Sequence, residues 1–111
     1  MKRGEIYYAD LSPTVGTEIN KHRPVLVVSC NANNRAAGTV TVLPITSSTA
    51  RIYPFEVFLN PSESGLPKPS KAQAQQIRTI AKERITGTAQ GRLNEARLAA
   101  VDAALRIHLS L

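Results

Sequence analysis

The sequence has one cysteine, no tryptophan and only 5% aromatic residues. A single cysteine excludes a disulfide within the chain, and no group of Cys, His, Asp or Glu shows the spacing of a zinc site. With few aromatic residues, the core must consist of Val, Ile, Leu and Ala. We expect Cys30, at the end of an apolar strand, to be a small buried residue. We expect neither a metal nor another cofactor.

Long apolar runs are also absent. No segment approaches the roughly 20 residues that a membrane span requires. The basic start, Met1–Arg3, is followed by Gly4 and Glu5 instead of the apolar stretch of a secretion signal. We therefore expect a soluble, cytoplasmic protein without a membrane partner. Because internal repeats and linkers are lacking, the sequence predicts a single domain over residues 1–111.

Negative charge is scarce, with 8 Asp and Glu against 14 Lys and Arg and a net charge of +6. Such a balance in a small domain indicates a polyanionic partner, either nucleic acid or an acidic protein segment. The same excess could serve solubility alone. The acidic residues are scattered and do not pair as catalytic carboxylates do, and the glycines do not form a nucleotide-binding pattern.

The hydrophobic pattern predicts short strands, long loops and one terminal helix. We expect strands over residues 4–10, 24–30, 39–45 and 54–59, with a further one over 72–80. Residues 82–85 fit one helical turn. From Leu93 onward, apolar residues recur every three or four positions, which predicts an amphipathic helix with Asn94 as its N-cap. The expected fold class is mainly β with a C-terminal helix packed on a small curled sheet or barrel.

Two prolines mark a candidate site. Arg23 precedes Pro24 at the start of a buried strand, and the residue before a proline is restricted to extended conformations. Pro44 interrupts the third strand just before Thr46, and such irregularities often redirect side chains at active sites. If the two strands are neighbours, a stiffened arginine and a row of hydroxyls face one cleft. From these residues alone, an ordinary surface arginine and a polar turn are the simpler interpretation.

Several blocks of the sequence resemble those of the MazF/PemK-family toxins, in the same order along nearly the whole chain. They are Arg3–Tyr7, Ala9–Pro13, Gly16–Glu18, Arg23–Val28, Pro44–Ser47 and Gln76–Ile80. The resemblance implies an SH3-like barrel (the CcdB/MazF/Kid-like toxin fold), a homodimer, and a sequence-specific, ribosome-independent endoribonuclease that cleaves single-stranded RNA, an mRNA interferase. It also implies a cognate acidic, MazE-like antitoxin whose disordered tail covers the cleft.

The resemblance also implies the catalytic residues. In the MazF branch they are an arginine before proline and a threonine that closes the third strand, matched here by Arg23 and Thr46. The PemK/Kid branch uses an aspartate and an arginine where this chain has Gln75 and Gln73, so we expect the MazF-type pair. Arg23 would stabilise charge on the phosphate and could also protonate the leaving oxygen, and Thr46 would donate a hydrogen bond to a non-bridging oxygen. His22 is a possible auxiliary acid or base.

Base recognition is expected to fall mainly to the loop over residues 14–21, whose side chains offer donors and acceptors to splayed bases. The RNA-binding candidates are Thr17, Glu18, Asn20, Lys21, Ser47, Gln76 and Arg78. Each loop residue could equally be solvated. For four further cations, a solvated surface position is expected in preference to phosphate contact: Lys68, Lys71, Lys82 and Arg84.

Two other functions compete with RNA cleavage. The chain could be a non-catalytic nucleic-acid-binding barrel, in which Arg23 and the lysines only hold phosphates. It could also be a gyrase poison on the related CcdB-like scaffold. Those toxins act through a C-terminus that contains tryptophan, and the absence of tryptophan here argues against that function.

Overall fold

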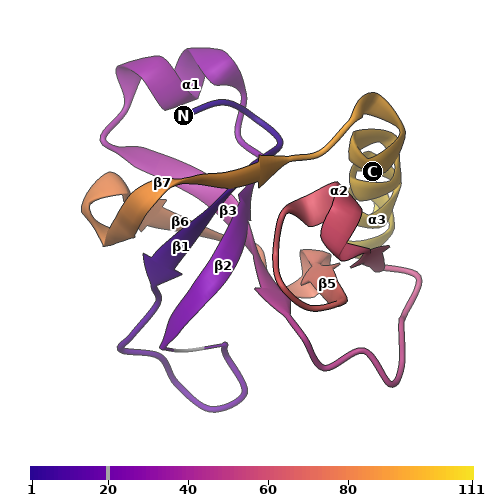
Figure 1. The fold of residues 1–111 in the computed structure, drawn as a ribbon. Coiled ribbons are helices and arrows are strands. Elements are labelled where there is room, and N and C mark those ends of the chain that lie inside the picture. Colours follow the sequence, from indigo (N-terminus) through magenta and orange to yellow (C-terminus); the bar gives the residue numbers. More distant parts are fainter. Residues whose placement is uncertain (20) are drawn as a thin grey trace.

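A computed structural model describes residues 1–19 and 21–111 of the chain. Along the chain the elements are β1 (Glu5–Asp10), β2 (His22–Val27), α1 (Asn31–Ala36), β3 (Thr39–Thr46), β4 (Glu56–Leu59), α2 (Pro61–Ser64), β5 (Ser70–Gln73), η1 (Ala74–Gln76), β6 (Arg78–Ala81), η2 (Lys82–Arg84), β7 (Ile85–Arg92) and α3 (Glu95–Leu109). Among the described residues, no helix is long and apolar enough to cross a membrane. The predicted class, mainly β with a C-terminal helix, is confirmed (Figure 1).

The strands form one curled antiparallel sheet in the order β4-β5-β3-β2-β1-β7. Strand β3 is its centre, because β2 pairs with one edge while β6 and β5 share the other. Pro44 lies between the part of β3 paired with β6, Thr39–Val42, and the part paired with β5, Ile45–Thr46. A proline has no N–H for a ladder, so it is tolerated where the partner strand changes. No ladder among the described residues joins the two ends of the sheet, so the barrel stays open.

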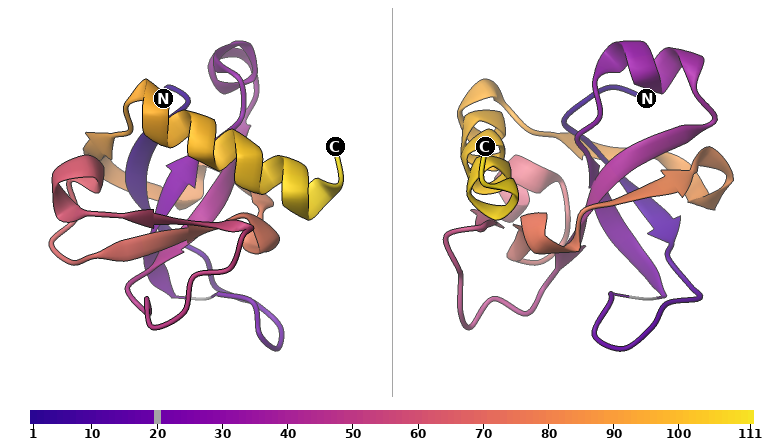
Figure 2. Two further views of the ribbon diagram at one scale, coloured as in Figure 1. Left: turned by 90° about the vertical axis from the view of Figure 1, so that its right-hand side faces the viewer. Right: turned by 180° about the vertical axis from the view of Figure 1, so that it is seen from behind.

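Two apolar clusters stabilise the fold, one on each side of the central strands. The larger lies between the sheet and α3, which crosses the sheet in Figure 2, and includes Leu26, Leu43 and Val101. The smaller contains Val25, Val42 and other residues of the opposite face. Each fully buried aliphatic side chain contributes about 1.5–3 kcal/mol. Both faces of β2 and β3 are therefore packed against apolar residues, and this packing fixes the positions of the ends of the two strands.

The start of α3 is where the sequence predicts it. The Asn94 side chain accepts a hydrogen bond from the Arg97 N–H at 2.9 Å, which satisfies one of the free amides of the first turn. Helix α2 was not expected, because its segment contains several prolines. Pro61 occupies the first turn, where its missing N–H costs nothing, and Asn60 and Glu63 form a capping box.

Other local predictions were wrong. Cys30 is exposed, because β2 ends at Val27 and Cys30 is the N-cap residue of α1. The strand expected over residues 72–80 is two strands, β5 and β6, separated by the turn η1. Strand β7 gave no sequence signal: it is polar, with most of its side chains exposed, and it exists because its backbone pairs with β1.

Helix α2 and strand β7 touch through their backbones at Gly65. A Cβ on Gly65 would lie 2.1 Å from the Gln90 carbonyl oxygen, and the residue has φ +77. We expect Gly65→Ala to lower the free energy of unfolding by about 1–3 kcal/mol, because alanine disfavours this conformation and nothing there can yield. Gly38→Ala is the control, since a Cβ there meets nothing within 4 Å. Equal urea midpoints for the two variants would contradict this prediction.

Candidate functional site

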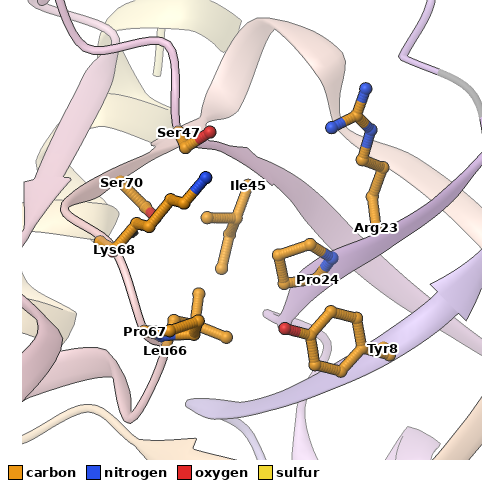
Figure 3. Close-up of a pocket in the computed structure, with 9 residues that line it drawn as sticks. All are labelled: Tyr8, Arg23, Pro24, Ile45, Ser47, Leu66, Pro67, Lys68 and Ser70. Atoms are coloured by element: carbon orange, nitrogen blue, oxygen red, sulfur yellow. Dashed lines mark hydrogen bonds between the residues drawn. The ribbon is translucent and has the colours of Figure 1, made fainter.

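A pocket of about 130 Å³ opens where β2 begins and β3 ends. Tyr8 of β1 pairs with Pro24 of β2, and both side chains line it. The remaining lining residues come from β2, the end of β3 and the segment that leads into β5: Arg23, Ile45, Ser47, Leu66, Pro67, Lys68 and Ser70. In Figure 3, the Lys68 ammonium and the Ser47 hydroxyl lie on one side and Tyr8 and Pro24 on the other, with the Arg23 guanidinium beyond Pro24.

The two predicted catalytic residues stand at neighbouring strand ends. Strands β2 and β3 pair with Val25 opposite Pro44, and continuing this register by two residues would set Arg23 opposite Thr46. Facing positions of an antiparallel pair place their side chains on the same side of the sheet. The adjacent strands anticipated from the two prolines are thus confirmed, and catalysis by Arg23 and Thr46 stays a prediction.

The Thr46 hydroxyl is positioned by its own turn. Its Oγ1 accepts a hydrogen bond from the Ser48 N–H at 3.2 Å. A hydroxyl has one proton and two lone pairs, so this bond occupies an acceptor site and leaves the proton available to donate. Thr46 can therefore serve as a donor to an anionic oxygen, which is the role expected for it.

The loop between β1 and β2 is held by side chains from residues 76–84. The Gln76 amide donates to Thr17 O and accepts from the Ile19 N–H, both at 3.3 Å. Arg78 donates to Leu11 O at 3.1 Å, and Arg84 donates to Asp10 O at the same distance. Gln76 and Arg78, two of the RNA-binding candidates, therefore have a structural contact with the loop, and RNA binding by them stays a prediction.

The loop candidates themselves are exposed. Thr17, Glu18 and Lys21 have exposed side chains, and Glu18 Oε1 accepts from the Val15 N–H at 3.1 Å. Asn20, also a candidate, lies outside the described residues. Ser47 lines the pocket as described. The structure therefore brings Ser47 together with Arg23, while the loop side chains face solvent beside them.

His22 lies on the side of β2 opposite to Arg23, as strand alternation requires. Its ring stacks on Tyr8 with centroids 5.4 Å apart, and its Nε2 lies 2.8 Å from Thr86 Oγ1. The imidazole thus supports the outer side of a residue that lines the pocket. An acid–base role for His22 stays a prediction.

A buried ion pair lies behind the site, and sequence analysis missed it. The expectation that Lys71 is solvated was wrong: the residue is 7% exposed, and its Nζ lies 2.9 Å from Glu56 Oε1 and 2.8 Å from Arg51 O. The amides of Gln73 and Gln75 donate to Glu56 Oε2 at 2.9 and 2.6 Å. The alternation of polar residues with Ala72 and Ala74 is the one sequence signal that could have indicated a shared polar face.

This environment fixes the charge of Glu56. Burial by itself raises the pKa of the carboxyl, but hydrogen bonds from the Tyr53 N–H, Gln73, Gln75 and Lys71 outweigh it and lower the pKa to about 2. Glu56 is therefore an anion at every physiological pH. Its bonds join the segment before β4, strand β5 and the turn η1, which contains Gln76 and precedes Arg78.

The other three cations that were expected to be solvated, Lys82, Arg84 and Lys68, differ in what their side chains contact. Lys82 donates to Asn34 O at 2.6 Å and so joins η2 to α1, while Arg84 binds the loop as described. Lys68 is exposed and lines the pocket. Among the described residues, no group of three or more His, Cys, Asp or Glu is arranged to hold a metal ion.

Comparison with known proteins decides the family. Residues 2–109 match the family described as PemK-like, MazF-like toxin of type II toxin–antitoxin systems. The chain belongs to this toxin family. The chain is 47% identical over 116 residues to endoribonuclease MazF9 of Mycobacterium tuberculosis, covering 100% of this chain and 98% of that protein. It is 38% identical to endoribonuclease EndoA of Bacillus subtilis, covering 100% and 96%.

Solved structures agree with the family assignment. An endoribonuclease of a mycobacterial species, in complex with its cognate antitoxin, superposes with a TM-score of 0.82 and 30% identity, covering 100% of this chain and 96% of that one. This MazF-like toxin therefore has the fold of its family, and the SH3-like toxin fold implied by the resemblance is confirmed, with the sheet left open.

Proposed function

We propose that this MazF-like toxin is a ribosome-independent endoribonuclease that cleaves single-stranded RNA at a defined sequence, without a metal ion. The observation that carries the proposal is the placement of Arg23 in a pocket at the start of β2, next to the end of β3 that carries Thr46, in a chain of net charge +6. The relatives named endoribonucleases support the activity. Neither of these two relatives is named as a non-catalytic nucleic-acid-binding protein.

The chemistry uses the substrate's own nucleophile. The ribose 2′-oxygen attacks the adjacent phosphorus, its proton passes to a base, and the bond to the 5′-oxygen of the next nucleotide breaks. The products are a 2′,3′-cyclic phosphate and a 5′-hydroxyl. Arg23 presents a fixed fork of N–H donors to the phosphate as its charge grows, and Thr46 donates to a non-bridging oxygen. A guanidinium stays protonated, so Arg23 cannot be the base, and the proposal leaves the base unassigned.

The net positive charge and an exposed apolar surface of the chain support proposals about its antitoxin partner and its oligomeric state. A cognate acidic antitoxin would bind this basic toxin, and the antitoxin complex of the mycobacterial endoribonuclease supports that assignment. The end of α3 exposes Ile107, Leu109 and Leu111, beside a groove that also contains Val28 and Ile77. An apolar face of this kind suits a second copy of the chain, so we propose a homodimer that acts on RNA in the cytoplasm.

Cleavage of a long RNA by the purified protein in excess EDTA tests the proposal. We expect discrete fragments that end in a 2′,3′-cyclic phosphate, because the attacking oxygen belongs to the ribose. A 2′-deoxy nucleotide at the mapped cut should abolish cleavage there, and the same RNA with a deoxy nucleotide elsewhere is the control. A gel shift without cleavage would instead establish the non-catalytic binding barrel.

A further inference from the structure

The β3–β4 loop, residues 47–55, carries a row of planar side chains. The rings of Tyr53 and Phe55 are stacked, with an interplanar angle of 3° and centroids 5.3 Å apart. The guanidinium carbon of Arg51 lies 5.4 Å from the Tyr53 ring centroid, and its Nη1 donates to the Tyr53 hydroxyl at 3.0 Å. Tyr53 is 41% exposed, and Arg51 is exposed as well. The loop therefore presents a guanidinium plane and an aromatic ring to solvent.

The buried ion pair fixes the main chain that presents this row. Lys71 Nζ donates to Arg51 O at 2.8 Å, and Glu56 Oε1 accepts from the Tyr53 N–H at 2.9 Å. The backbone is thus bound at both residues whose side chains face outward. A ligand that stacks on these side chains does not have to order the loop first, which reduces the entropic cost of binding.

The row lies close to the candidate site. Ser47 lines the pocket together with Arg23, and Arg51 follows Ser47 by four residues, a span of at most ~14 Å. In Figures 1 and 2 the start of β2 and the β3–β4 loop lie at the same end of the molecule, and α1 lies at the other. Residues 47–55 include no Asp or Glu, so the loop itself does not repel phosphate. An RNA strand that leaves the pocket along this loop reaches the row.

We propose that Arg51 and Tyr53 form a stacking platform for a base outside the sequence that is cut, without preference for one base. Every base has an aromatic face, so stacking on rings and guanidinium planes tolerates any sequence. The guanidinium also attracts the phosphates of the strand. An acidic protein segment would satisfy the charge but not the planar row, whereas RNA satisfies both. The inference rests on the proposed function and adds a source of affinity that is independent of sequence.

The Tyr53→Trp variant reports on stacking directly, because the chain has no other tryptophan. The probe is an RNA whose mapped cut carries a 2′-deoxy nucleotide, so that it binds without being cleaved. We expect this RNA to quench the indole fluorescence, whichever of the four bases lies on the platform. An abasic ribose moved along the strand should remove the quenching at one position outside the cut sequence. Ala32→Trp, at an exposed position of α1, is the control and should not be quenched.

Two results would contradict the platform in this experiment. The first is quenching of Tyr53→Trp that no abasic position removes, since it would not arise from a stacked base. The second is quenching by a polyglutamate peptide but not by the RNA, which would assign the row to an acidic protein segment.

Two further substitutions measure what the ring contributes to affinity. Tyr53→Ala should weaken binding of the uncleavable RNA by about 5- to 150-fold, the usual effect of losing one base–aromatic stack. Tyr53→Phe keeps the ring and should keep the affinity of the wild-type protein. An unchanged affinity for Tyr53→Ala, or an equal loss for Tyr53→Phe, would overturn the inference. Absence of cleavage by the wild-type protein would refute the proposed function, whereas cleavage without quenching of Tyr53→Trp would refute the platform alone.

Discussion

Arg23→Ala is expected to lower the rate of RNA cleavage by about 10²- to 10³-fold, the usual effect of removing one preorganised donor from a transition state. Arg23 is half-buried and precedes a proline in β2, so its backbone direction is fixed before RNA binds. Single-turnover cleavage of a fluorescent oligonucleotide measures the effect. Thermal melting followed by circular dichroism should show that the variant remains folded.

Arg23→Lys is expected not to restore activity, because an ammonium cannot present the planar pair of donors that fits two phosphate oxygens. Arg35→Ala removes a charge from exposed helix α1 and provides the matched control for net charge. If Arg23→Ala cut RNA at the wild-type rate, the assignment of this residue would be wrong. Activity recovered by Arg23→Lys would show that charge alone suffices.

Glu56→Gln is expected to lower the free energy of unfolding by about 3–5 kcal/mol, because it leaves the Lys71 ammonium buried without its counter-charge. The Glu56 side chain is 0% exposed and that of Lys71 is 9% exposed. Urea titration measures the loss.

Glu83→Gln, in the exposed position of η2, should change stability by no more than about 0.5 kcal/mol. The double variant Glu56→Gln/Lys71→Met should recover part of the loss, and a double variant no more stable than Glu56→Gln would contradict this account.

The lowered pKa of the Glu56 carboxyl predicts a loss of stability in acid. Its pKa is about 2 in the folded chain against 4.5 for the ordinary value. The unfolded chain therefore binds the proton first as pH falls, so the contribution is complete above about pH 4.5 and is lost between there and pH 2. It amounts to about 3 kcal/mol. Unfolding measured across this range should show a shallower pH dependence for Glu56→Gln, and parallel curves would contradict the prediction.

The sequence predicted the parts of the fold that carry a periodic apolar signal or special backbone chemistry. The strands around Val25 and Val42 and the helix after Asn94 follow from such patterns. Arg23 stood out because proline restricts the residue before it, but its predicted catalytic role came from the family resemblance and not from this restriction. Strand β7 could not be found this way, because a polar edge strand is stabilised by backbone pairing with β1 and not by its side chains.

The partners of long polar side chains were not predictable either. Lys71 has the sequence context of a surface lysine, because nothing local shows that it forms an ion pair with Glu56 of the neighbouring strand β4. Gln76 and Arg78 contact a loop that lies 57 to 67 residues away in the chain, which no local pattern shows, and RNA binding by them stays a prediction. The sequence around Lys68 does not distinguish it from the other lysines, and only the fold places it in the same pocket as Arg23.

The grip of Gln76, Arg78 and Arg84 on the β1–β2 loop has an evolutionary consequence. All three side chains hold main-chain amides or carbonyls, so these contacts do not depend on which side chain an exposed loop residue such as Thr17 carries. Substitutions at Thr17 can therefore accumulate without removing these contacts. Descendants of one ancestral toxin could in this way acquire new RNA targets by drift at the loop surface, while the machinery that breaks the phosphodiester stays unchanged.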